Sequence, residues 1–190
     1  MPDDTALLAV LESLRERGAL GESSLPQAVS HAGAFVAALP PSTRRVLDLG
    51  SGGGLPGLVI AVRLPNLHVV LTDRRERRTD LLRMAVTRLG IADRVEVVTG
   101  DVSVLGRRKE YEAQFDAVTA RAFGGPMWTL SCARPFLGVG GVVIVSDPPE
   151  SDPSVRWPAA ELGRLGLTRS TAAVAHTGSQ VSRFWMALPA

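Results

Sequence analysis

Residues 48–57 read Asp-Leu-Gly-Ser-Gly-Gly-Gly-Leu-Pro-Gly, and this stretch decides the fold class of the chain. It overlaps the end of a short apolar segment, residues 45–49, and leads into a second apolar segment that opens at Pro56. Proline suits the first turn of a helix. A strand, a glycine loop and a helix in this order let the backbone approach a ligand where side chains would clash. The stretch therefore predicts a ligand site between a strand and a helix.

Two overlapping patterns fit this loop. Residues 52–57 match G-x-G-x-x-G, the pattern of dinucleotide-binding loops. Residues 48–54 match D-x-G-x-G-x-G, which resembles motif I of the methyltransferases. A carboxylate at the end of a buried strand is costly unless a partner satisfies it, so Asp48 favours the second pattern. A tight turn with no ligand is the alternative.

Outward from the loop, apolar segments of strand length alternate with helical patterns. Strands are predicted at 45–49, 67–72, 95–98, 115–120 and 141–146, and helices from Pro56 and at 77–89, 126–136 and 157–165. Such alternation indicates parallel pairing with right-handed crossovers, hence a doubly wound α/β sheet. Two further helices come first. One carries leucines at 7, 8, 11 and 14, and the other spans 25–39 before Pro40-Pro41. We therefore expect a helical extension, residues 1–41, and a Rossmann-like domain, residues 42–190.

The end of the chain breaks the alternation. Residues 167–175 and 181–188 are two strand-like runs joined by residues 176–180, which have hairpin length and contain a glycine. A mostly parallel seven-stranded sheet that ends in an antiparallel hairpin is typical of class I S-adenosylmethionine methyltransferases. An NAD-type oxidoreductase would continue with a parallel sixth strand.

Two more acids follow predicted strands. Asp73 closes the second strand, where a carboxylate can accept hydrogen bonds from both hydroxyls of a ribose; the alternative is the N-cap of the next helix. Asp101 follows the third strand, where it either lies near an adenine amino group or serves as a polar turn residue. Three tryptophans, at 128, 157 and 185, are expected to pack, although an exposed one would suit base stacking.

The composition is that of an ordinary globular protein. The 190 residues are 45% hydrophobic and 21% charged, with a net charge of +2. Cys132 stands alone, so we expect a packing role in a reducing compartment. The first residues, Met-Pro-Asp-Asp, lack the positive charge of a signal peptide, and no apolar window suits a membrane span. We expect a cytoplasmic monomer without metal. Arginines cluster at 74–78 and 107–108, where they suit either phosphate or an ordinary solvated face.

Three segments resemble the RsmG family, also called glucose-inhibited division protein B. Residues 46–57 are similar to V-L-D-[LV]-G-S-G-A-G-[LF]-P-G, including the distinctive Leu-Pro-Gly ending. Residues 71–82 are similar to L-x-D-S-x-x-K-R-x-x-F-L, and residues 115–122 to F-D-x-[IV]-[ST]-[SA]-R-A. The last pattern contains Arg121, its most specific residue.

The resemblance implies methyl transfer from S-adenosylmethionine to N7 of a guanine in small-subunit (16S) ribosomal RNA, with the RNA or the small ribosomal subunit as partner. The residues expected to bind the cofactor are Asp48, Gly50, Ser51, Gly52, Gly54, Leu55, Asp73, Arg74, Asp101, Val102 and Arg121. Arg121 is also the expected catalytic residue, in contact with an RNA phosphate or the cofactor's carboxylate. The alternative for Arg121 is a surface ion pair.

The chain departs from the family pattern on the RNA-facing side. Residues 1–40 lack the aromatic-rich W-N-x-x-x-N-L-T-like segment, and His31 either replaces the family's histidine or has a surface or capping role. Ser146-Asp147 stands where the family has lysine and glycine, and Asp147-Pro148-Pro149 is expected to form a turn. A methyltransferase with another substrate, such as a small molecule, or a non-catalytic relative that binds cofactor or RNA, therefore remains an alternative.

Overall fold

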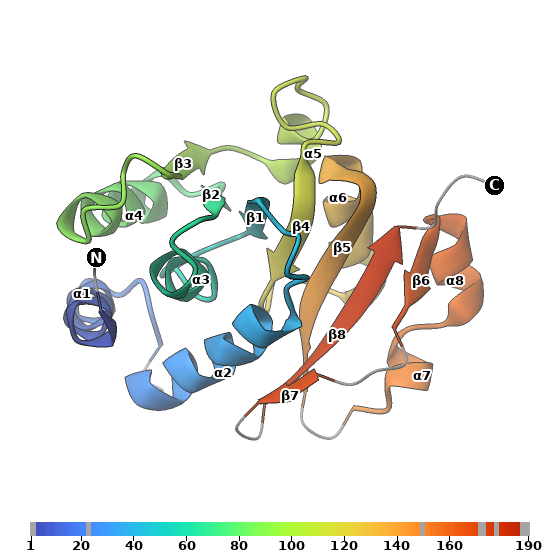
Figure 1. The fold of residues 1–190 in the computed structure, drawn as a ribbon, viewed down its shortest axis with the longest axis horizontal. Coiled ribbons are helices and arrows are strands. Elements are labelled where there is room, and N and C mark those ends of the chain that lie inside the picture. Colours follow the sequence, from blue (N-terminus) through green and yellow to red (C-terminus); the bar gives the residue numbers. More distant parts are fainter. Residues whose placement is uncertain (1–2, 22–23, 149–150, 171–173, 177–178, 187–190) are drawn as a thin grey trace.

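A sheet with helices on both faces forms the molecule in the computed structural model, which describes residues 3–21, 24–148, 151–170, 174–176 and 179–186 (Figure 1). The strands are β1 (Arg45–Leu49), β2 (His68–Asp73), β3 (Val95–Thr99), β4 (Phe115–Ala120), β5 (Leu137–Asp147), β6 (Leu167–Arg169), β7 (Val174–His176) and β8 (Ser179–Met186). The helices are α1 (Asp4–Glu16), α2 (Leu25–Ala38), α3 (Gly57–Arg63), α4 (Glu76–Arg88), α5 (Val102–Leu105), α6 (Pro126–Ala133), the 3-10 turn η1 (Arg134–Phe136), α7 (Pro153–Arg156) and α8 (Ala159–Arg164).

The strand order is β3-β2-β1-β4-β5-β8-β6, and β7 also pairs with β8. Strands β1 to β5 pair in parallel, whereas β8 runs antiparallel to β5, β6 and β7. The chain order reverses between β1 and β4, and at such a switch point the loops after the two strands diverge and leave a crevice. This topology confirms the predicted doubly wound sheet with an antiparallel end, and it contradicts the parallel sixth strand of an NAD-type oxidoreductase.

Alternation along the strands divides the core into two clusters. Val46, Leu71 and Ala117 face α1 to α4, whereas Leu47, Val70 and Val118 face the side of α5, α6 and α8. Successive side chains on a strand point to opposite faces, so each buried strand has to be apolar on both. Figure 1 shows the helices of these two groups on opposite sides of the sheet.

The first two helices belong to the larger of these clusters. Asp3 caps α1 by accepting a hydrogen bond from Ala6 N at 2.9 Å, and α2 begins with Pro26 in its first turn. Leu7, Leu11 and Phe35 are fully buried against α3, α4 and the sheet. The core therefore continues without a break across the expected boundary after residue 41. None of the helices formed by described residues is long and apolar enough to cross a bilayer.

The remaining predictions differ in detail. The short helices α5 and α7 were not predicted, because four residues are too few for a hydrophobic period to be recognised. The predicted helix 126–136 ends in the 3-10 turn η1. The predicted strand 167–175 overlaps two strands, β6 and β7, so the sheet has eight strands rather than seven. Residues 171–173 and 187–188 lie outside the described residues. Cys132 is buried, as expected.

Replacing Phe35 with alanine tests the anchoring of α2. The ring is fully buried, so Phe35→Ala should lower the free energy of unfolding by about 3–5 kcal/mol in urea denaturation. Val139 is 82% exposed, so Val139→Ala should change it by no more than about 0.5 kcal/mol. Equal effects of the two substitutions would contradict the packing of α2 on the sheet.

Candidate functional site

Asp48 lies at the end of β1 and connects four parts of the fold. Its Oδ1 accepts a hydrogen bond from Thr119 Oγ1 on β4 at 2.7 Å. Its backbone oxygen accepts from Ser51 Oγ in the glycine loop at 3.0 Å and from Thr72 Oγ1 on β2 at 2.9 Å. The side chain is fully buried. The carboxylate is therefore satisfied in part by Thr119 on the neighbouring strand β4.

Burial dominates the ionisation of Asp48. Desolvation raises the pKa of this carboxyl to about 6, although the hydroxyls of Thr119 and Ser51, the N–H of Gly57 and the charge of Arg121 all lower it. Oδ2 is buried and has no hydrogen bond of good geometry within the described structure. A buried carboxylate oxygen in this condition suits a site that is completed by a ligand or an ordered water.

At two glycines in and directly after the loop, a side chain would collide with neighbouring atoms. Gly50 has a φ of +61°, and a Cβ there would lie 2.6 Å from Cδ2 of Phe123. At Gly57, a Cβ would lie 2.8 Å from Oδ2 of Asp48 and 2.3 Å from Cδ2 of Leu71. The first position keeps the backbone bare beneath Phe123, and the second lets α3 begin directly against the buried carboxylate.

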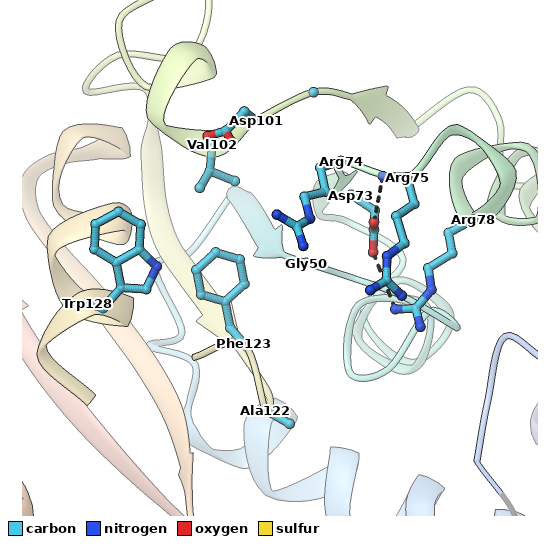
Figure 2. Close-up of a pocket in the computed structure, with 11 residues that line it drawn as sticks. Gly50, Asp73, Arg74, Arg75, Arg78, Asp101, Val102, Ala122, Phe123 and Trp128 are labelled. Atoms are coloured by element: carbon cyan, nitrogen blue, oxygen red, sulfur yellow. Dashed lines mark hydrogen bonds and ion pairs between the residues drawn. The ribbon is translucent and has the colours of Figure 1, made fainter. Parts of the chain in front are cut away.

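A cavity of about 410 Å³, called here the first cavity, lies at the carboxyl ends of β1 to β4. Its lining residues are Gly50, Asp73, Arg74, Arg75, Arg78, Gly100, Asp101, Val102, Ala122, Phe123 and Trp128. In Figure 2 the Phe123 ring and the Arg74 guanidinium point into it from opposite sides. The cavity is therefore polar and arginine-rich at one end and apolar at the other.

Asp73 provides the carboxylate at the polar end. Its Oδ2 accepts from Gly52 N at 3.1 Å and its Oδ1 from Arg75 N at 2.9 Å, and Arg78 Nη1 lies 3.8 Å away. The N-cap of α4 is Arg75, so the alternative role of Asp73 as the helix cap is wrong. A carboxylate has about four acceptor positions, and two N–H donors leave room for ligand hydroxyls.

Asp101 and Val102 form the wall after β3. Asp101 is the N-cap of α5, and its Oδ1 accepts from Ser103 N at 2.8 Å and Ser103 Oγ at 2.6 Å. These bonds lower the pKa of Asp101. The residue is thus a structural cap and a cavity residue at the same time, with the apolar Val102 beside it.

The apolar end contains an exposed aromatic side chain. Trp128 on α6 is 62% exposed at the rim, so it does not pack in the core, and the alternative of an exposed ring applies to it. Trp157 is buried as predicted, and the side chain of Trp185 lies outside the described residues. The exposed ring leaves a flat surface next to Phe123, of the kind on which a purine stacks.

A second cavity of about 310 Å³ adjoins the first and shares Ala122 and Phe123 with it. Its lining residues are His31, Arg121, Ala122, Phe123, Gly124, Thr129, Val145, Ser146, Asp147, Pro148 and Arg156. Ala122 has a φ of +50°, a conformation that L-residues avoid and that occurs mostly at functional turns. Arg121 lines only the second cavity, whereas the next two residues, Ala122 and Phe123, line both.

Arg121 and His31 both line the second cavity. Arg121 is half-buried, its Nη1 has no described hydrogen-bond partner, and burial lowers its pKa. No described carboxylate forms an ion pair with it, so the surface ion pair has no described partner. His31 is half-buried, its Nε2 has no described hydrogen-bond partner, and burial and the charge of Arg121 lower the pKa of the imidazole.

The structure places the predicted site residues in three groups. Gly50, Asp73, Arg74, Asp101 and Val102 line the first cavity, whereas Arg121 lines the second. Asp48, Ser51, Gly52, Gly54 and Leu55 are buried in or beneath the loop, where Gly52 N–H orients Asp73. The prediction missed Phe123 and Trp128 as lining residues. Phe123 lies two positions after Arg121, so its place just after the end of β4 was the sequence signal that could have identified it as a lining residue.

The first cavity fits S-adenosylmethionine. Its volume is within the range of small-molecule sites. The Asp73 carboxylate suits ribose hydroxyls, Val102 and the two aromatic rings suit an adenine, and the arginines suit a carboxylate. Bare backbone at Gly50 and the incompletely bonded Asp48 beneath it suit the amino-acid portion.

Comparison with known proteins identifies relatives for more than half of the chain. The sequence model of the family described as GidB, rRNA small subunit methyltransferase G, matches residues 28–146. A ribosomal RNA small subunit methyltransferase G of Kineococcus radiotolerans is 32% identical over 159 residues, which are 80% of this chain and 60% of the relative. The corresponding protein of Moorella thermoacetica is 30% identical over 132 residues, 70% of this chain and 55% of the relative.

The chain therefore spans about half the length of the relatives it matches. Among solved structures, an O-methyltransferase from Bacillus cereus in complex with SAH superposes with a TM-score of 0.65 at 19% identity. The superposition covers 97% of this chain and 91% of that one. This likeness shows a shared class I methyltransferase fold over nearly the whole chain.

Asp48→Asn tests the buried carboxylate through pH. The pKa of Asp48 in the folded state, about 6, exceeds the ordinary value of 3.8, so the folded protein binds the proton more tightly. Stability from this proton is therefore present below about pH 4 and lost as pH rises to about 6, by about 3 kcal/mol in all. Urea unfolding from pH 4 to 7.5 should show this decline in the wild type and a flatter profile in the variant. Parallel profiles would refute the raised pKa.

Proposed function

Because the chain belongs to the family of rRNA small subunit methyltransferase G, we propose that it transfers a methyl group from S-adenosylmethionine to N7 of a guanine in small-subunit (16S) ribosomal RNA. The observation that carries this proposal is the meeting of two cavities at Ala122 and Phe123. A methyl donor and a methyl acceptor have to lie next to each other in separate sites, and the two cavities provide that arrangement.

The first cavity holds the donor in this proposal. Asp73 accepts hydrogen bonds from the ribose hydroxyls, while Val102 and Trp128 contact the adenine. Asp101 accepts a hydrogen bond from the adenine amino group, and Arg74 or Arg78 pairs with the carboxylate. When bound, S-adenosylmethionine supplies a methyl group on a sulfonium centre, whose C–S bond breaks as the acceptor's lone pair forms the new bond.

The second cavity holds the acceptor. Guanine N7 has a free lone pair and no proton to lose, so the enzyme does not need a general base. The work of these residues is to orient the two reactants and exclude water, which accounts for about 7–11 kcal/mol of a barrier in well-oriented reactions. Asp48 and the glycine loop fix one reactant, and Arg121 and its neighbours fix the other.

Arg121 contacts the acceptor nucleotide in this scheme. It lines the second cavity and not the first, so it is closer to the acceptor than to the cofactor's carboxylate. An arginine usually binds guanine through O6 and N7 together, and that contact would occupy the lone pair that has to react. Arg121 therefore contacts the nucleotide away from N7.

Four further expectations belong to this proposal. An enzyme of small-subunit RNA acts in the cytoplasm, and the lone pair of N7 requires no metal to activate it. We also propose that residues 1–41 form a helical unit appended to the methyltransferase domain, residues 42–190, and that the protein acts as a monomer.

Methyl transfer to ribosomal substrates tests the function. The protein should transfer label from S-adenosylmethionine to small ribosomal subunits, or to their naked RNA, prepared from a strain that lacks this gene. Mass spectrometry of the digested RNA should show 7-methylguanine. A retained affinity for S-adenosylmethionine without any labelled RNA would leave a methyltransferase of another substrate, such as a small molecule, or a non-catalytic relative.

Asp73→Ala tests the donor site. Loss of the two ribose contacts should weaken binding of S-adenosylmethionine by at least about 100-fold in calorimetry, because each hydrogen bond to a charged group contributes about 1.5–3 kcal/mol. Asp80→Asn is the matched control, since Asp80 is an exposed acid on α4 that pairs only with Arg83 among the described residues. Unchanged affinity of the Asp73 variant would exclude the ribose role.

A further inference from the structure

Positive side chains line the second cavity. Its described lining residues include His31, Arg121 and Arg156, with Asp147 as the one carboxylate among the described lining residues. Burial and the charge of Arg121 lower the pKa of His31, so the two arginines are the cationic side chains. The charge of Arg121 is opposed by the buried Asp48, and Arg156 pairs with Asp147. Guanidinium donors at the wall of a cavity suit an anionic oxygen of the molecule that enters it.

Arg156 is held in place by a small polar cluster. The side chain of Asp147 is 3% exposed, and its Oδ1 accepts a hydrogen bond from Trp157 Nε1 at 3.0 Å. Arg156 Nε lies 3.3 Å from the same oxygen, and the guanidinium carbon lies 5.0 Å from the centre of the Trp157 ring. The ion pair and the ring thus fix both the position and the plane of this guanidinium.

The ion pair between Asp147 and Arg156 leaves the other N–H groups of the guanidinium available for a ligand. The nearest contact of Asp147 with Arg156 is at Nε, and no described hydrogen bond engages Nη1 or Nη2. The side chain is 24% exposed and lines the second cavity, but not the first. A planar fork of N–H donors at the wall of a cavity matches the oxygens of a phosphate.

We propose that Arg156 binds the phosphate attached to the acceptor nucleoside, with Asp147 and Trp157 as the residues that position it. This inference rests on the proposed function, in which the second cavity receives a nucleotide of RNA. It explains why Asp147, an acid in a cavity for an anionic substrate, does not repel that substrate: its charge is already opposed by Arg156. The phosphate contact would fix the acceptor while Arg121 remains for the base.

A fragment assay tests the phosphate contact without turnover. With S-adenosylhomocysteine present, the wild-type protein should bind guanosine 5′-monophosphate or guanosine 3′-monophosphate about tenfold more tightly than guanosine. Arg156→Gln should remove this preference, and Arg156→Lys should keep part of it. Arg164→Gln is the control, because Arg164 is exposed on α8 and lines neither cavity. Equal binding of nucleotide and nucleoside by the wild type would overturn the inference.

The same variants in the RNA assay separate this role from a merely structural one. Arg156→Gln should raise KM for RNA about tenfold or more, with kcat and the affinity for S-adenosylmethionine little changed. The slope of log affinity against log salt should fall by about 0.7, as for one phosphate of a single strand. Asp147→Asn should raise KM while leaving that salt slope in place. A fall in kcat or in cofactor affinity with an unchanged slope would overturn the inference.

The two assays also distinguish the two proposals. If the wild type prefers the nucleotide over the nucleoside but methylates no ribosomal RNA, the proposed function fails and the phosphate site stands. If it methylates RNA but shows no nucleotide preference, the proposed function stands and the role of Arg156 fails.

Discussion

Asp48 sits out of contact with solvent where β1 ends, and the polar groups around it connect β1 to β2, β4 and the glycine loop. A carboxylate in such a place costs free energy unless hydrogen bonds and nearby charge compensate for lost hydration. Here the compensation is partial, because Oδ2 is unpartnered and the pKa is raised to about 6. The start of α3 therefore lies directly against the carboxylate, which requires glycine at position 57, because a Cβ there would lie 2.8 Å from Oδ2 of Asp48.

The turn after β4 converts this arrangement into two sites. Arg121 leaves the strand toward the second cavity, Ala122 adopts a left-handed conformation, and Phe123 crosses over Gly50 into the first cavity. The strained backbone at Ala122 lies at the topological switch point, where the loops after β1 and β4 diverge. Fold topology thus fixes the boundary between donor and acceptor, and the side chains on either side determine what each cavity binds.

Much of this architecture was predictable from the sequence, because it depends on local patterns. The periods of the strands and helices predicted the parallel sheet, and the positions of Asp73 and Asp101 after predicted strands indicated that they belong to the site. Contacts between distant segments were not predictable in the same way. His31 comes from α2 and Arg156 from a four-residue helix, and neither carries a sequence pattern that points to the second cavity. The exposure of Trp128 depends on the path of α6, which hydrophobicity alone does not reveal.

The most direct measurement is the position of the sulfur atom in a crystal structure of the protein with S-adenosylhomocysteine. The amino-acid portion should lie over Gly50 and Gly52, above the buried Asp48, with the ribose at Asp73. The sulfur should then face the boundary between the cavities, at Ala122 and Phe123. A sulfur that faces away from this boundary, or a ligand bound outside the first cavity, would contradict the assignment of the two cavities to donor and acceptor.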